Sequence, residues 1–115
     1  MTGDIEVRDD PERSRYEATL DGEVAGWVEY IRSSRRVVFT HTFVDPDFRG
    51  LGIAGALAGR AIGDAEEDGT RTVVPRCPYI ASWMDDHPRY AHLRRGTAGA
   101  PRPASDTATP LTPKA

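Results

Sequence analysis

The spacing of apolar residues changes once along this chain of 115 residues, and the change lies near Val44. Before it, apolar and polar residues alternate in short runs separated by turn residues, the pattern of β-strands. After it, apolar residues recur at positions i, i+3, i+4 and i+7, which marks one face of an amphipathic helix. We therefore expect a mixed α/β fold of the α+β type that begins with several antiparallel strands.

Four alternating runs define the first strands. They cover residues 5–8, 14–20, 23–31 and 37–44. Asp21-Gly22 is a strong hairpin signal between the second and third runs, and Asp9 begins a break after the first. The last run is apolar enough to be a central strand.

The helical part follows a single crossover. The expected stripe of the first helix consists of Ala54, Leu57, Ala58, Ala61, Ile62 and Ala65. Gly69 is placed to end that helix, a short strand covers residues 72–74, and a second helix covers residues 79–86. The expected order is β-β-β-β-α-β-α, in a mixed and mainly antiparallel sheet. Its one crossover makes the fourth and fifth strands parallel neighbours.

A glycine-rich turn lies between the fourth strand and the first helix, with Arg49, Gly50 and Gly52 in it. Such a turn directs unpaired N–H groups outward at the positive end of the helix dipole, where a phosphate can bind. The turn lacks the Gly-Lys-Ser/Thr of a P-loop and the spacing of the dinucleotide fingerprint. From these residues alone, phosphate binding and a simple helix cap both remain open.

Composition excludes several classes of function. Fifteen basic and eighteen acidic residues give a formal charge of −3, so no basic surface for nucleic acid is expected. No apolar run approaches the ~20 residues of a membrane helix, and the N-terminus lacks a signal-peptide pattern, so we expect a cytoplasmic protein without a membrane partner. The one cysteine, Cys77, cannot form an internal disulfide, and we expect no metal site.

The last residues differ in composition from the rest. Residues 96–115 are almost entirely Gly, Ala, Thr, Ser and Pro, with few apolar side chains for a core. Such a segment cannot offset the entropy lost on ordering. We therefore expect one domain, residues 4–95, followed by a disordered tail, residues 96–115.

Four motifs carry a resemblance to a known family. Arg49-Gly50-Leu51-Gly52-Ile53-Ala54 resembles the Arg/Gln-x-x-Gly-x-Gly/Ala signature of the GCN5-related N-acetyltransferases. The segments 41–44, 75–78 and 87–90 together resemble the minimal branch of that family, over about residues 7–93. The resemblance implies an acyl-CoA N-acyltransferase-like fold, with acetyl-CoA as co-substrate and an unidentified amine as acceptor.

The same resemblance implies a cofactor site and some missing parts. Residues 49–54 would hold the acetyl-CoA pyrophosphate, and the main chain of Phe43 and Val44 would pair with its pantetheine arm. We expect no room for the helical pair that usually follows the first strand, and we expect the tail to begin where the family often has two further strands. Met84 stands where the family often has an acidic tyrosine hydroxyl.

Cys77 and His41 are the candidate catalytic residues. A thiol at a helix N-terminus beside Arg76 can have a lowered pKa and an accessible thiolate, although most lone cysteines are packed core residues. His41 lies in the fourth strand, with Phe39 and Phe43 expected on its own face. Histidine is the side chain whose ordinary pKa suits a base near neutrality, although one within a strand is commonly a packed residue.

The expected function is therefore acetyl transfer from acetyl-CoA to an amine, either directly or through an acetyl-Cys77 intermediate. An acyl-CoA-binding or regulatory module without transferase activity is the alternative, and a small interaction domain is a third. Gly55, Gly59 and Gly63 recur along the first helix. We expect a close backbone approach at Gly55 and none at Gly63.

Overall fold

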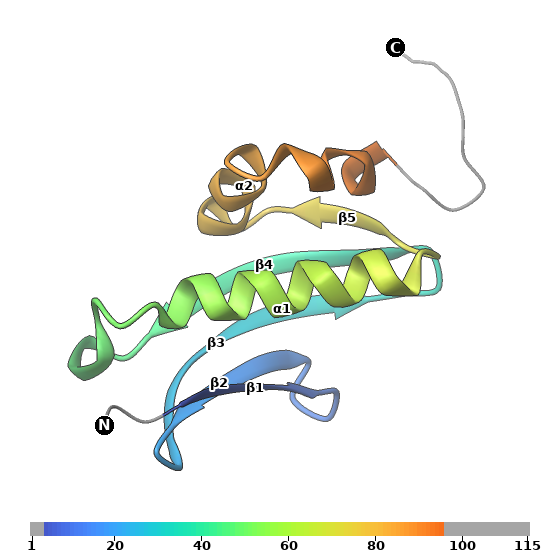
Figure 1. The fold of residues 1–115 in the computed structure, drawn as a ribbon. Helices are drawn as coiled ribbons and strands as arrows, with labels where there is room; N and C mark the ends of the chain where they lie inside the picture. Colours follow the sequence, from blue (N-terminus) through green and yellow to red (C-terminus); the bar gives the residue numbers. More distant parts are fainter. Residues whose placement is uncertain (1–3, 96–115) are drawn as a thin grey trace.

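A computed structural model describes residues 4–95 of the chain, which form one five-stranded sheet with the strands in sequence order (Figure 1). The strands are β1 (Ile5–Asp10), β2 (Arg15–Leu20), β3 (Glu23–Arg32), β4 (Arg36–Val44) and β5 (Thr72–Pro75). The helices are α1 (Ile53–Asp68) and α2 (Pro78–Asp85), with the 3-10 segments η1 (Pro46–Phe48) and η2 (Pro88–Arg95). The tail expected at residues 96–115 lies outside the described residues.

The strand pairing agrees with the expected order. Strands β1 to β4 pair antiparallel with their neighbours, and β4 and β5 pair parallel across the single crossover through α1. Gly69 ends α1 in the left-handed conformation with φ +70°, and its N–H donates to Ala65 O. The expected fold is therefore confirmed, including the helix between β4 and β5.

The predicted break at Asp9 is wrong, because β1 continues to Asp10. Asp9 pairs with Tyr16, and Asp10 with Arg15. The Asp9 carboxylate accepts hydrogen bonds from Tyr30 Oη at 2.5 Å and Arg32 at 3.2 Å. These partners on β3 stabilise an aspartate at a strand position that its local propensity disfavours.

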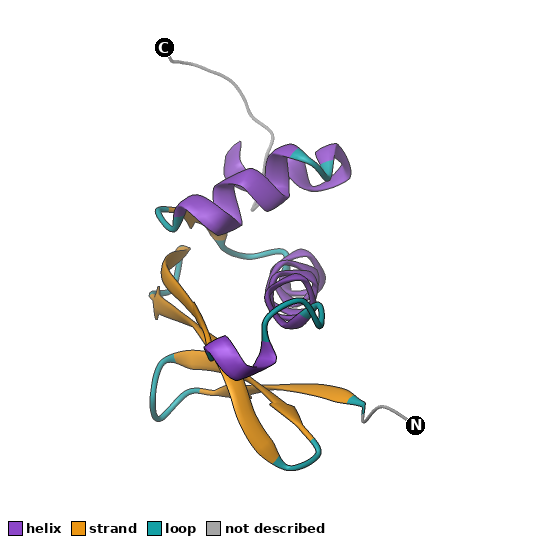
Figure 2. Ribbon diagram, turned by 90° about the vertical axis from the view of Figure 1, so that its left-hand side faces the viewer, coloured by secondary structure: helices purple, strands orange, loops and turns teal. Residues whose placement is uncertain are grey.

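Helix α1 covers one face of the sheet, and no helix of residues 4–95 lies over the opposite face (Figure 2). The apolar stripe of α1 is buried at Ile53, Leu57, Ala58, Ala61, Ile62 and Ala65, as the periodicity predicts. It packs on inward-facing side chains of the sheet, among them Tyr16, Val28 and Phe39. The core thus lies between α1 and the sheet, and the other face of the sheet stays accessible.

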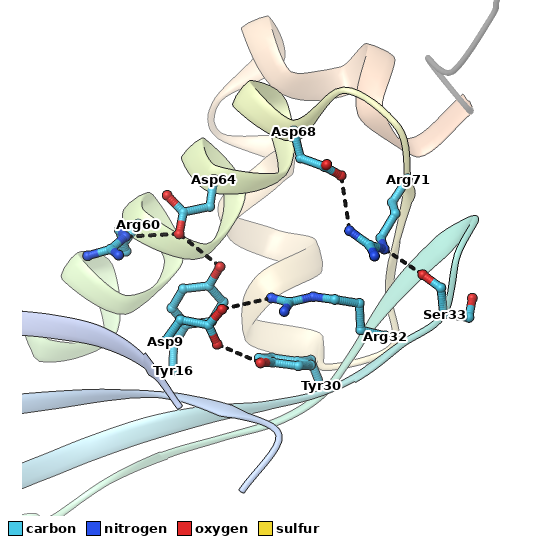
Figure 3. Close-up of polar contacts among 9 residues, drawn as sticks. All are labelled: Asp9, Tyr16, Tyr30, Arg32, Ser33, Arg60, Asp64, Asp68 and Arg71. Atoms are coloured by element: carbon cyan, nitrogen blue, oxygen red, sulfur yellow. Dashed lines mark hydrogen bonds and ion pairs between the residues drawn. The ribbon is translucent and has the colours of Figure 1, made fainter. Parts of the chain in front are cut away.

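A polar network joins α1 to the same face of the sheet (Figure 3). Tyr16 Oη donates to Asp64 Oδ2 at 2.9 Å, as Tyr30 Oη does to Asp9. Burial, and then the bond to Asp9, raises the pKa of Tyr30 to about 12. Both phenols therefore remain protonated donors over the whole physiological range.

A cavity of about 210 Å³ lies beside this network, lined in part by Asp9, Asp64 and Asp68. Each carboxylate has an arginine partner: Arg32 at 3.2 Å, Arg60 at 2.9 Å and Arg71 at 3.3 Å respectively. Because these charges are already paired within the fold, we assign the cluster a structural role.

The close approach expected at Gly55 is wrong, and the structure places one at Gly26 instead. A Cβ on Gly55 would make an ordinary contact of 3.9 Å with the Tyr79 hydroxyl, and one on Gly63 would meet nothing within 4 Å. A Cβ on Gly26 would lie 2.4 Å from Phe43 O and 3.2 Å from the Ile53 side chain. Gly26 therefore lets β3, β4 and the start of α1 meet.

Candidate functional site

Strands β4 and β5 separate partway along β4. Their parallel ladder runs from Arg36 and Thr72 to Phe39 and Pro75. Cys77 N then donates to Phe39 O at 2.8 Å, and Pro78 begins α2. Beyond this point no described residue of β5 pairs with residues 40–44. The main-chain groups on that edge of β4 are therefore available to an extended ligand.

The turn after β4 has the geometry of an anion site. Gly50 and Gly52 are left-handed, with φ +79° and +85°. Gly52 is the N-cap of α1 and provides no side-chain cap, and the first helical bond runs from Ala56 N to Gly52 O. The N–H groups of residues 53–55 therefore precede the helical ladder and can donate to a ligand.

A pocket of about 290 Å³ opens in front of this turn. Six predicted cofactor residues line it: Val44, Arg49, Gly50, Gly52, Ile53 and Ala54. The structure brings in Tyr79 from α2 as well. Burial, with a smaller contribution from Asp86, raises the pKa of Tyr79, so its hydroxyl remains a hydrogen-bond donor.

Two predicted cofactor residues do not line the pocket. Leu51 is 47% exposed at the tip of the turn. The Phe43 ring lies on the sheet face away from α1, 4.6 Å from the Trp27 ring. The Phe43 carbonyl lies against Gly26 of β3, and Asp45 N donates to Ala25 O, so the main chain of Val44 and not that of Phe43 faces the unpaired edge of β4. The expected pairing of a ligand with the Phe43 main chain is therefore wrong.

Cys77 is the N-cap of α2, as expected, but its thiol is not accessible. The side chain is 4% exposed and belongs to the hydrophobic core. Its Sγ lies 3.1 Å from Thr42 Oγ1, which shares a hydrogen bond with it. The prediction of an accessible thiolate is wrong, because α2 and β4 close around the sulfur.

The contact of Thr42 with the candidate residue Cys77 was not predicted. The partner of Thr42 in the ladder is Val28, whose side chain is buried in the core. Strict alternation from Val44 would have placed Thr42 on the core side of β4. A hydroxyl on the core side of β4, beside the end of β5, was the sequence signal that could have indicated this contact.

His41 is exposed and lies on the sheet face away from α1. Its expected shared face with Phe39 is wrong. Glu29 pairs with His41 and Tyr30 with Phe39, so Thr40 is the extra residue of a β-bulge. The bulge shifts the alternation and leaves Phe39 1% exposed in the core. His41 and Cys77 therefore approach the end of the β4–β5 ladder from different faces.

Met84 is 1% exposed in the core, so it lies apart from the pocket as a packing residue. Within residues 4–95, no cluster of three or more His, Cys, Asp or Glu could hold a metal ion. None of the described helices is long and apolar enough to cross a membrane.

Comparisons with known proteins relate this chain to one family. A family model described as GCN5-related N-acetyl-transferase matches residues 15–93. This range includes the glycine-rich turn and the two separating strands, β4 and β5. Among solved structures, the chain is similar to a ribosomal-protein-alanine N-acetyltransferase from Brucella melitensis biovar Abortus 2308. The two are 24% identical, with a TM-score of 0.49, over 83% of this chain and 67% of that chain. No curated protein matches the chain.

Proposed function

Because the chain belongs to the GCN5-related N-acetyltransferase family, we propose that it transfers an acetyl group from acetyl-CoA to an amine. One observation carries the proposal: the pocket at the start of α1 meets the unpaired edge of β4 at Val44. A ligand with a phosphate at one end and an extended arm at the other would fit both. The direct test is amine-dependent release of CoA from acetyl-CoA.

The turn fits a pyrophosphate. A Cβ at Gly50 or Gly52 would meet nothing within 4 Å, so the backbone is open on its outer side. The N–H groups of residues 53–55 and the positive end of the α1 dipole would hold the phosphates. Arg49 is exposed and forms no ion pair with the described residues, so its guanidinium is free to add a charge-assisted bond.

The edge of β4 would position the reacting group. The main chain of Val44 would pair with the pantetheine arm, as an added strand does. An N–H on this edge would polarise the thioester carbonyl, the role of an oxyanion hole. Acetyl-CoA supplies the activated acetyl thioester when it is bound.

His41 is the proposed base, alone or through a water molecule. It would take one proton from the acceptor ammonium, and the free amine nitrogen would then bond to the acetyl carbon. The carbon–sulfur bond breaks, and the second amine proton is lost as the leaving thiolate gains one. The proton balance is met by His41 and solvent.

We propose that Cys77 supports the reaction centre from the core side of β4 and forms no covalent intermediate. Its sulfur is buried and packed against Thr42. We expect Cys77→Ser to retain most of the turnover, since a hydroxyl can keep the bond to Thr42. Intact mass measured after acetyl-CoA is added without an amine should show no acetyl adduct. A stoichiometric adduct that Cys77→Ala lacks would contradict direct transfer and establish an acetyl-cysteine route.

Two observations favour a different function, an acyl-CoA-binding or regulatory module. Residues 11–14 alone connect β1 to β2, and the buried Met84 offers no acidic hydroxyl. Such a module would bind CoA at the same turn but would leave acetyl-CoA intact in the presence of every amine. The release of CoA therefore separates the two functions.

A further inference from the structure

Side chains of three strands form two rows on the sheet face away from α1. Cross-strand pairing places Arg15, Glu29 and His41 in one row over β2, β3 and β4. The neighbouring row contains Glu17, Trp27 and Phe43. The His41 end of these rows lies on β4 beside the proposed path of the acetyl group.

Glu29 is a carboxylate without a cationic partner, although Arg15 is its neighbour on β2. The Arg15 guanidinium turns instead to Glu17, at 2.6 Å, and stacks 4.2 Å from the centre of the Trp27 ring. Among residues 4–95, Glu29 enters no ion pair. The Glu29 carboxylate therefore faces this surface without a direct ion-pair partner, with the Arg15 guanidinium nearby on the Trp27 ring.

The Glu29 carboxylate is also held in place. Trp27 Nε1 donates to Glu29 Oε2 at 2.9 Å, which leaves Oε1 for another donor. His41 lies directly opposite on β4, where side chains of paired residues are about 5 Å apart at Cβ. A small cation between Glu29 and His41 would touch both side chains. It would lie over β3 and β4, next to the unpaired edge of β4.

The surface beside this position is apolar. The Trp27 and Phe43 rings are half-buried and lie 4.6 Å apart, with a tilt of 36° between their planes. They would cover the hydrocarbon part of a molecule whose charged end reaches Glu29. Arg15 already covers one face of the Trp27 indole. The hydrocarbon part of the ligand would therefore take its other aromatic contact from the Phe43 ring.

We propose that the acceptor is a primary ammonium on an apolar body, bound on this sheet face with its ammonium between Glu29 and His41. The proposal rests on the proposed acetyl transfer and adds its acceptor site. Glu29 is the specificity-determining residue, because its half-buried carboxylate pairs with a cation, whereas a neutral analogue leaves the carboxylate charge without a partner. His41 is then in contact with the nitrogen whose proton must leave.

The test uses 2-phenylethylamine as the probe and 2-phenylethanol as its neutral analogue. The indole N–H resonance of Trp27 reports on binding at Glu29, and the resonance of Trp83, on α2, is an internal control. In the wild-type protein saturated with CoA, the amine should shift the Trp27 resonance and bind at least about tenfold more tightly than the alcohol. Equal binding of amine and alcohol would overturn the proposal.

Glu29→Gln keeps the size of the side chain and an acceptor for the Trp27 N–H, and removes the charge. We expect it to raise the KM for 2-phenylethylamine about tenfold, with the CoA affinity and the binding of the alcohol unchanged. Glu23→Gln is the matched control, because it removes the same charge from an exposed position at the start of β3. If Glu29→Gln and Glu23→Gln have the same KM, Glu29 does not hold the acceptor.

Failure of the two proposals gives different results. A protein that does not release CoA with any amine, yet shows the charge-dependent Trp27 shift, contradicts acetyl transfer and supports the cation site. A protein that acetylates amines without any Trp27 shift contradicts the site on this face and leaves the transfer intact. Glu29→Asp, which keeps the charge, should retain the preference for amine over alcohol.

Discussion

Gly52→Val is expected to weaken CoA binding by more than about tenfold, or at least about 1.4 kcal/mol. A side chain at Gly52 would project into the open space in front of the turn, because a Cβ there meets nothing within 4 Å. That space is where a phosphate must approach the N–H groups of residues 53–55. The φ of +85° adds strain for a β-branched residue, which can displace the N–H groups themselves.

Gly22→Val is the matched control for this variant. Gly22 lies in the β2–β3 turn with φ +84°, and a Cβ there also meets nothing within 4 Å. The substitution therefore carries the same backbone strain at a residue that does not line the pocket. Calorimetric titration of both folded variants with CoA should show the loss at Gly52 alone. Equal affinities in the two variants would place the CoA site elsewhere.

Gly26→Ala is expected to lower the free energy of unfolding by about 1–3 kcal/mol, the cost of overpacking a filled core. The new Cβ would lie 2.4 Å from Phe43 O, a backbone atom that cannot rotate away. Strand β4 or β3 must then shift at the point where Val44 enters the pocket. For a domain of this size, each kcal/mol corresponds to a fall of about 4–8 °C in Tm.

The control is Gly63→Ala, which makes the same chemical change where nothing lies within 4 Å. Gly63 is in the interior of α1, so alanine should stabilise the helix by up to about 1 kcal/mol. Thermal unfolding should therefore separate the two variants in opposite directions. A Gly26→Ala protein as stable as the parent would show that β3 and β4 adjust without cost.

The elements that were predictable from sequence depend on local patterns. Each of these patterns extends over only a few neighbouring residues. They are the alternation in β2, β3 and β4, the helical stripe from Ala54 to Ala65, and the helix-ending Gly69. The glycine-rich turn was found for the same reason, because the end of a strand, two glycines and the start of a helix are adjacent in the chain.

The features that were missed depend on contacts between strands. The bulge at Thr40 reverses the face of His41 relative to Phe39, and only the register against Glu29 reveals it. The burial of Cys77 depends on how α2 closes over β4 at Thr42. Glu29 forms no ion pair because the Arg15 guanidinium turns to Glu17, and no local sequence pattern predicts that arrangement.

The most direct test of the central claim measures CoA release from acetyl-CoA with and without added amines, together with the mass of the products. A panel of primary amines that includes 2-phenylethylamine should give equal amounts of free CoA and N-acetylated amine, with no release when the amine is left out. The Gly52→Val protein should lose this activity at limiting acetyl-CoA. Tight binding of CoA by the wild-type protein, with no acetylated product from any amine, would contradict acetyl transfer and identify a CoA-binding module.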